Sequence, residues 1–340
     1  MILTTMIHAQ ESLFYIGSYT KDKTKGGIWS AKMNTDTGAF SVADMATPAP
    51  NPTYITISPE DDFVFAAEEN TQGTVASFQR SPDGKLSLIS RQSSSGSGPC
   101  HVEVDRTGKT LFVANYTSGT IASYAIQPDG VLSEPLETFD LRKLFGISDP
   151  AIQSHAHGNY IDSANHTLYS CDLGTDSVGV FQFNAEQRKL TPLASHGKLN
   201  TKSGPRHLAF HPSGKWLYVN QEMSLAISIF ERHPDGGIDT PLQVISTIPE
   251  GTETKGVSTA EILCHPSGKW IYLSNRGHDS ITVFAVGNDG KLSWVENVPS
   301  LVKFPRGMMF NPSGKWLLVA GQKDNRITSF RVDPSTGKIQ

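Results

Sequence analysis

Short apolar runs alternate with polar turns along the whole chain, and one combination of turn and run recurs. Its clearest copies are HPSGKWLYV from His211, HPSGKWIYL from His265 and NPSGKWLLV from Asn311. Looser copies begin at residues 58, 105 and 162, so successive copies are separated by 47, 57, 49, 54 and 46 residues. A period of about 50 residues predicts an architecture built by repeating one supersecondary unit.

Each copy lies in a unit that has the pattern of four short strands. One apolar strand at His207–His211 leads into the Pro-Ser-Gly-Lys turn, a second follows at Trp216–Asn220, and a third alternating strand covers Ala226–Glu231. A turn with Asp235 and Gly236 then introduces a fourth strand. Asp-Gly and Ser-Gly pairs favour hairpins because these turns need positive φ angles. The pattern therefore predicts antiparallel strands joined by tight turns.

Seven such units predict an all-β protein, a seven-bladed β-propeller of four-stranded antiparallel blades. The second and third strands of the units are expected within Phe14–Lys32, Phe65–Gln79, Leu111–Ile126, Leu168–Phe183, Leu217–Glu231, Ile271–Val286 and Leu317–Val332. The only helical candidate, Leu141–Gly146, is interpreted as an insertion. We expect one propeller domain over residues 11–340, after a tail or signal-peptide stub at residues 1–10. The strand that closes the ring either would follow Gln340 or comes from Met1–Gln10.

Composition narrows the function classes. The 340 residues carry 29 Lys and Arg against 33 Asp and Glu, without a basic run, which argues against nucleic-acid binding. No apolar stretch approaches the roughly 20 residues of a membrane span. The three cysteines lie far apart and form no CxxC pair, so neither a zinc site nor a disulfide framework is indicated. The N-terminus has no basic region, which favours a cytoplasmic protein; a signal-peptide remnant there would make it periplasmic.

Two positions of the repeat carry polar residues that differ from unit to unit, whereas the packing positions stay apolar. Five residues before each copy stand Thr53, Cys100, His157, Arg206, Ala260 and Arg306. Eleven residues after its start stand Glu69, Tyr116, Leu173, Glu222, Arg276 and Gln322. The first strand of a blade lines the centre of a propeller, so we expect both sets at one mouth of the central channel. A merely solvated channel is the alternative, but clustering of these groups in units four to six favours a binding site.

The residue types point to a particular chemistry. Arginines bind carboxylates or phosphates through two parallel hydrogen bonds. A glutamate and a histidine offer the base and acid that water attack on an ester needs. No GxSxG motif indicates a serine nucleophile. His155 and His157 would share one strand face, but no third metal ligand is evident, so we expect no metal and no cofactor.

An ordered set of short motifs resembles the seven-bladed lactonase family, which includes the propeller-type 6-phosphogluconolactonases and the fungal carboxy-cis,cis-muconate cyclase. The motifs are YIGSYT from Tyr15, NPTY from Asn51, FVANY from Phe112, HAH from His155, GPRH from Gly204, NQE from Asn220, NRG from Asn275, PRG from Pro305 and AGQ from Ala320. The resemblance implies a catalytic set of His157, Arg206, Glu222 and Arg276, which is also the set that the repeat positions select. We expect substrate contacts from His155, His101, Glu261, Arg306 and Gln322.

The resemblance implies a hydrolase acting on a sugar lactone, above all 6-phosphogluconolactone of the pentose phosphate pathway. In this hypothesis Arg206 and Arg276 hold the anionic group or the carbonyl oxygen, Glu222 activates water and His157 protonates the leaving oxygen, with acid and base exchangeable. A lactone-forming cycloisomerase and a non-enzymatic binding scaffold are the alternatives. The expected partner is a small anionic lactone, not a nucleic acid or a membrane, and the sequence predicts no particular oligomeric state.

Overall fold

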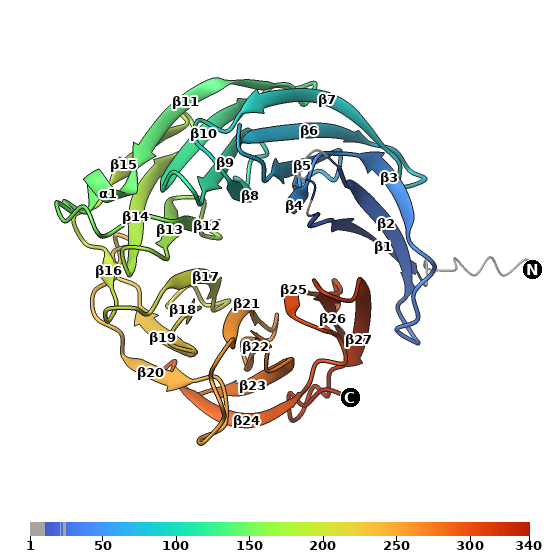
Figure 1. Ribbon diagram of the computed structural model, residues 1–340, viewed down its shortest axis with the longest axis vertical. Helices are drawn as coiled ribbons and strands as arrows, with labels where there is room; N and C mark the ends of the chain where they lie inside the picture. The colour runs from blue at the N-terminus through green and yellow to red at the C-terminus, as the bar shows by residue number, and fades with distance from the viewer. Residues whose placement is uncertain (1–10, 21, 23–24) are drawn as a thin grey trace, which may run out of the picture.

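Seven antiparallel sheets are arranged as a ring in the computed structural model, which describes residues 11–20, 22 and 25–340 (Figure 1). Each sheet is one blade, and the blades follow one another in chain order around the ring. The chain runs from the inner strand of each complete blade to its outer strand. The predicted seven-bladed propeller is therefore confirmed.

The blades are numbered 1 to 7 along the chain. Blades 1 to 3 are β1 (Glu11–Gly17), β2 (Gly27–Asn34), β3 (Asp44–Pro48); β4 (Pro52–Ile57), β5 (Phe63–Glu68), β6 (Thr74–Arg80), β7 (Leu86–Ser93); and β8 (Pro99–Val104), β9 (Thr110–Asn115), β10 (Thr120–Ile126), β11 (Leu132–Asp140). Blades 4 and 5 are β12 (Ala156–Ile161), β13 (Thr167–Asp172), β14 (Ser177–Asn184), β15 (Lys189–Pro192), β16 (Gly197–Lys198); and β17 (Pro205–Phe210), β18 (Trp216–Gln221), β19 (Ala226–Glu231), β20 (Gln243–Ser246). Blades 6 and 7 are β21 (Ser258–Cys264), β22 (Trp270–Arg276), β23 (Ser280–Val286), β24 (Leu292–Pro299); and β25 (Pro305–Phe310), β26 (Trp316–Gly321), β27 (Arg326–Arg331).

The predicted insertion contains the helix α1 (Leu141–Leu144), capped by the Asp140 side chain. Blades 1 and 7 have three strands each in the described part of the chain, and the other sheets have four or more. The seven predicted strand pairs are all present. Residues 1–10, predicted as a tail and as one source of the closing strand, lie outside the described residues.

The repeated turn ties each blade to the next. Its glycines, Gly214, Gly268 and Gly314, have φ angles of 70°, 73° and 74°, which glycine adopts without a steric penalty. His211 Nε2 lies 3.1 Å from the carbonyl oxygen of Gly268, and His265 Nε2 lies 3.2 Å from that of Gly314. Each motif histidine thus contacts the motif turn of the following blade.

The recurring tryptophans pack between blades, as their repetition predicts. Trp216 and Trp270 each lie against a hairpin glycine of the next blade, Gly290 and Gly337, where an added Cβ would come within 3 Å of the ring. Trp316 of blade 7 makes the same contact with Gly38 of blade 1, and its Nε1 donates to the Thr35 carbonyl at 2.8 Å. The ring is therefore closed by the same contact that joins its other blades.

The hydrophobic core lies between neighbouring blades. Between blades 2 and 3, for example, Phe65 packs with Leu111, Val113 and Tyr124, all of them fully buried. A cluster of Phe14, Met33, Trp316 and Leu318 spans blades 1 and 7. Burial of one such side chain contributes about 1.5–3 kcal/mol, so apolar packing holds blade 7 against blade 1.

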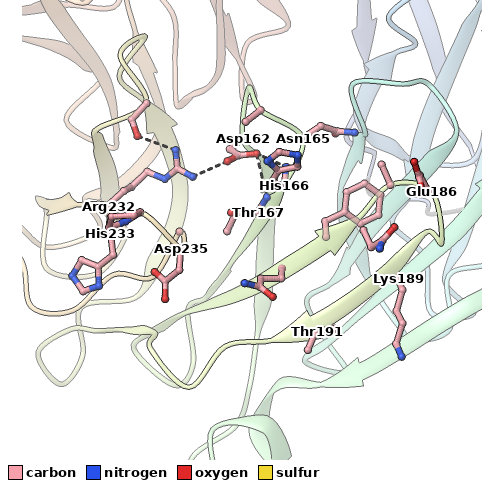
Figure 2. Close-up of a pocket in the computed structure, with 18 of the residues that line it drawn as sticks. Asp162, Asn165, His166, Thr167, Glu186, Lys189, Thr191, Arg232, His233 and Asp235 are labelled. Atoms are coloured by element: carbon pink, nitrogen blue, oxygen red, sulfur yellow. Dashed lines mark hydrogen bonds and ion pairs between the residues drawn. The ribbon is translucent and has the colours of Figure 1, made fainter.

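A groove of about 1240 Å³ separates parts of blades 4 and 5, away from the predicted site (Figure 2). None of the nine candidate site residues lines it. Arg232 crosses the groove floor, with its Nη2 2.7 Å from Asp162 Oδ2 and its Nε donating to the Tyr169 hydroxyl at 2.7 Å. Asp162 Oδ1 also accepts hydrogen bonds from the backbone amides of His166 and Thr167. The Asp162–Arg232 ion pair thus links blade 4 to blade 5.

We expect Asp162→Ala to lower the free energy of unfolding by about 3 kcal/mol, because it leaves a largely buried guanidinium without its carboxylate. The side chains of Asp162 and Arg232 are 3% and 13% exposed. As a control, Glu231→Ala breaks the exposed pair with Lys215 and should cost under about 1 kcal/mol. Urea unfolding at pH 7 measures both. Equal losses in the two variants would contradict the structural role of the Asp162–Arg232 pair.

Candidate active site

A β-bulge recurs near the start of every inner strand that the structure describes in blades 2 to 7. In β4, β8, β12 and β25 one residue has no partner across the strand pair, and in β17 and β21 two residues face one. The residues at the bulges are Thr53, Cys100, His157, Arg206 with His207, Ala260 with Glu261, and Arg306. Bulges re-aim side chains and occur beside active sites. The position five residues before each motif is thus displaced from the regular ladder.

Side chains of the second strands satisfy backbone amides released by the bulges. The His207 amide donates to Asn220 Oδ1 at 2.8 Å, and the Glu261 amide donates to Ser274 Oγ at 3.0 Å. Buried amides need such partners. The bulges of blades 5 and 6 are therefore stabilised features of the fold, and they fix the direction of Arg206 and its neighbours.

The second candidate position follows the end of the second strand and is fixed by the backbone. The Glu222 amide donates to the Gly204 carbonyl at 2.7 Å, and the Gln322 amide donates to that of Phe304 at 3.1 Å. Each bond joins the second strand to the segment that leads into the inner strand of the same blade. The two repeat positions selected from the sequence therefore lie at the same end of the blades.

Glu222 is held between two arginines. Its Oε2 lies 2.9 Å from Arg206 Nε and 2.9 Å from Arg276 Nη2. Arg206 also donates to the Ala260 carbonyl at 2.5 Å, and Arg276 to the Thr259 carbonyl at 2.8 Å. The side chains of Arg206 and Arg276 are only 2% and 6% exposed, whereas that of Glu222 is 24% exposed. The cluster therefore offers solvent a carboxylate edge backed by two fixed cations.

The positive charge of the cluster exceeds its negative charge. Burial, followed by repulsion from Arg206, lowers the pKa of Arg276 to about 10, so Arg276 remains a cation at neutral pH. Burial and Arg206 also lower the pKa of Arg306, which Glu69 partly offsets. Three arginines thus face the carboxylates of Glu222 and Glu69, and Glu261 next to Arg206 adds a carboxyl group whose pKa burial raises to about 7. The excess suits an anionic ligand or an oxygen that gains negative charge in a reaction.

His157 lies beside the cluster on the adjacent blade and is 5% exposed. Its ring meets Tyr116 edge-on at 5.7 Å and His207 at 5.0 Å between centroids. Burial and then the charge of Arg206 hold its pKa well below the usual 6.5, so the imidazole is neutral at pH 7. Its Nδ1 is buried and has no hydrogen-bond partner among the described residues. The imidazole is thus in the unprotonated form that a general base requires.

His155 and Tyr116 form a stacked pair at the same end. Their centroids are 4.5 Å apart with an interplanar angle of 14°, and His155 Nδ1 lies 3.0 Å from the Tyr116 carbonyl oxygen. Burial and the charge of Glu222 raise the pKa of Tyr116, which places this phenol near the cluster. Tyr116 was not among the predicted site residues, although it occupies the same repeat position as Glu222. That shared position is the signal that would have found it.

His101 and Glu261, both predicted to contact substrate, belong to a buried layer next to Arg206. His101 is fully buried and its ring lies 4.1 Å from that of Tyr54 and 4.7 Å from that of Tyr160. Glu261 Oε1 lies 2.9 Å from His207 Nδ1, and burial raises the pKa of Glu261 to about 7. Because the bulge turns the neighbouring residue toward the cluster, these two side chains pack behind it.

Arg306 and Gln322, the other two expected contacts, come from blade 7. The Arg306 guanidinium lies 5.4 Å from the centroid of Tyr19, a blade 1 residue that is 44% exposed. Gln322 Oε1 is buried and has no hydrogen-bond partner among the described residues. These residues form the side of the site opposite His157 in the ring.

The described part of the chain contains no group of three His, Cys, Asp or Glu side chains placed to hold a metal ion. Cys100, Cys171 and Cys264 are free thiols, and burial raises the pKa of Cys100 to about 12. No helix within the described ranges is long and apolar enough to cross a membrane.

The fold is a seven-bladed propeller, and the candidate site is a charged cluster beside the inner strands of its blades. Residues 13–340 match the family described as lactonase, 7-bladed beta-propeller, and the chain belongs to this family. Membership makes it a lactone hydrolase, as the resemblance implied.

Named relatives agree with this class. A 6-phosphogluconolactonase of Bacillus subtilis is 32% identical, covering 96% of this chain and 92% of its own. One from Formosa agariphila is 30% identical, covering 96% and 94%. The structure of the periplasmic gluconolactonase PpgL of Pseudomonas aeruginosa superposes with a TM-score of 0.85 at 26% identity, covering 96% and 94%.

Proposed function

We propose that this lactonase hydrolyses 6-phosphogluconolactone to 6-phosphogluconate at the His157, Arg206, Glu222 and Arg276 cluster. The observation that carries the proposal is the pair of buried arginines fixed on one carboxylate beside a neutral histidine. The names of the Bacillus and Formosa relatives support the phosphorylated substrate. The three arginines of the site support an anionic substrate.

In the reaction, the lactone carbonyl oxygen lies against the guanidinium groups of Arg206 and Arg276. Water attacks the carbonyl carbon while His157 takes one of its protons, and the oxygen becomes an oxyanion that the arginines stabilise. The bond between the carbonyl carbon and the ring oxygen then breaks. His157 returns its proton to that ring oxygen, which becomes the hydroxyl of the open acid. The sum is one water added, with the histidine restored.

This scheme gives His157 both roles, first as base and then as acid, whereas the sequence suggested Glu222 as the group that activates water. Glu222 Oε2 is already ion-paired with both arginines, at 2.9 Å from Arg206 Nε and from Arg276 Nη2. His157 is neutral and carries a buried nitrogen with no partner among the described residues. Glu222 instead holds the two arginines at the spacing that the carbonyl oxygen requires.

The compartment follows from the substrate in this proposal. Phosphorylated sugars are intracellular metabolites, so a phosphorylated lactone places the enzyme in the cytoplasm. The Pseudomonas gluconolactonase is described as periplasmic. An unphosphorylated lactone would be the corresponding substrate for a protein in that compartment.

We expect faster turnover of freshly generated 6-phosphogluconolactone than of unphosphorylated gluconolactone, with spontaneous opening subtracted from both rates. One additional charged hydrogen bond is worth about 1.5–3 kcal/mol, so kcat/KM should differ by about tenfold or more. Proton release in weak buffer follows both reactions. A preference for the unphosphorylated lactone would move the proposal to a gluconolactonase. Activity on neither would overturn it.

A further inference from the structure

Phe304, two residues before Arg306, has a left-handed backbone with φ of 61°. The equivalent residues of blades 2, 3 and 5 have the same conformation, with φ of 48°, 63° and 65°, and they are Asn51, Gly98 and Gly204. In all four blades the carbonyl of this residue accepts a hydrogen bond from the amide of the second candidate position. The left-handed position is therefore a shared feature of the repeat.

Among these four left-handed residues, only Phe304 has a bulky side chain. Glycine and asparagine adopt the left-handed region readily, whereas an aromatic residue there is strained. Strained residues persist where the surrounding structure enforces them, and they gather at ligand-binding sites. The backbone amide of Phe304 donates a hydrogen bond to Asp279 Oδ1 at 2.8 Å. This bond anchors the strained residue to blade 6. Glycine or asparagine occupies the equivalent left-handed position in blades 2, 3 and 5. The aromatic side chain of Phe304 is therefore the feature that needs explanation.

Two cations lie over that ring. The Arg276 guanidinium is 5.4 Å from its centroid and the Lys323 ammonium is 3.8 Å from it. Phe304 thus connects an arginine of the catalytic cluster with a second positive charge. His155, at the equivalent position in blade 4, likewise stacks on Tyr116 of the preceding blade. Rings therefore flank the cluster on two sides.

Lys323 has an exposed side chain that forms no ion pair with a carboxylate in the described ranges. Its amide donates to the carbonyl of Lys303, a second exposed lysine. The two neighbouring aspartates bind backbone amides: Asp324 Oδ2 accepts from the amide of Lys303, and Asp279 Oδ1 accepts from that of Phe304. Lys323 is therefore an exposed cation outside the buried cluster.

We infer that Phe304 and Lys323 form a subsite for the substituent of the lactone, in which the ring of Phe304 packs against the sugar and Lys323 binds the phosphate ester. The inference rests on the proposed function and names the residues that select the phosphorylated substrate. In the lactone the phosphate is carried on a side arm, attached to the ring carbon that bears the leaving oxygen. A cation beyond Arg276, and exposed where Arg276 is buried, suits that position.

The test compares Lys323→Met with Lys215→Met, which removes a lysine at 5.2 Å from the Trp216 ring, far from the site. The readout is the ratio of kcat/KM for 6-phosphogluconolactone to that for gluconolactone. We expect Lys323→Met to lower the ratio about tenfold, and less at high salt, because an exposed charge pair is screened. Lys215→Met should leave it unchanged. An unchanged ratio in Lys323→Met would overturn the subsite.

Phe304→Gly tests the strained residue itself. The substitution relieves the left-handed strain, so we expect an equal or higher unfolding midpoint together with a several-fold higher KM. Phe304→Leu keeps the strain and loses the aromatic face, so it should raise KM with a lower midpoint than Phe304→Gly. Unchanged KM in both variants would contradict a substrate contact.

Failure of the proposed function gives a different result. If the wild-type protein hydrolyses neither lactone, calorimetric titration with 6-phosphogluconate still tests the subsite. Weaker binding by Lys323→Met than by wild type supports it, and equal binding or no binding to wild type overturns it.

Discussion

Replacing Glu222 with glutamine should lower kcat/KM for lactone hydrolysis by about 10²- to 10³-fold while leaving the propeller folded. The carboxylate is the one negative group that Arg206 and Arg276 share, at 2.9 Å from each. An uncharged amide cannot balance two guanidiniums, so they separate and no longer meet at the carbonyl oxygen. The fold should survive, because the side chain is partly exposed and lies outside the cores between the blades.

Glu231→Gln provides the matched control, since Glu231 is an exposed glutamate of the same blade paired with Lys215 at 3.4 Å. Its activity should equal that of the wild type. Arg276→Ala examines the same cluster from blade 6 and should also lose most activity. Turnover near the wild-type rate in both Glu222→Gln and Arg276→Ala, with unchanged unfolding midpoints, would remove these residues from the mechanism.

The architecture was predictable because packing between blades constrains the same positions of the repeat. Trp216, Trp270 and Trp316 recur in blades 5 to 7 since each fills the same space against the next hairpin. The junction between blades 7 and 1 was not predictable in the same way, because the contact of Trp316 with Gly38 joins residues at opposite ends of the sequence. Only the closed ring shows that blade 1 supplies the partner that blade 7 needs.

The sequence could select the proposed catalytic set because two positions of the repeat lie at the same end of the blades. It could not predict the contacts of these residues, because a bulge has no sequence signature. The unpaired residues include Thr53, Cys100 and Arg306, which have no common side-chain property. Without the bulge, the sequence cannot distinguish a residue that faces the cluster from its neighbour. The substrate contacts expected of His101 and Glu261 therefore remain predictions; in the structure His101 packs on Tyr54, and Glu261 Oε1 lies 2.9 Å from His207 Nδ1.

The electrostatics of the site also depend on the folded structure. A histidine in an unfolded chain titrates near 6.5, whereas His157 is moved well below that value by burial and by Arg206. The sequence contains both residues but not the burial that decides which charge state prevails. The assignment of the base role to His157 in place of Glu222 follows from this environment.

His157→Gln should lower kcat by about 10²- to 10⁴-fold, because it removes the group that accepts the proton from water and returns it to the ring oxygen. KM should change little, since Arg206 and Arg276 still bind the carbonyl group. His233→Gln is the control, as His233 is a 42% exposed histidine of blade 5 paired with Asp239. A His157→Gln variant with normal kcat would exclude the imidazole as the base and return that role to Glu222.

The pH profile separates a catalytic His157 from a merely structural one. The base must be neutral, so wild-type activity falls only when pH drops through the pKa of His157, which lies well below 6.5. We therefore expect kcat to be nearly level from pH 7.5 to 6.5 and to decline at lower pH, after subtraction of spontaneous lactone opening. In His157→Gln the residual rate should lack that decline. A decline of the same shape in the variant would assign the titration to another group of the site, such as Glu261, whose pKa is raised to about 7.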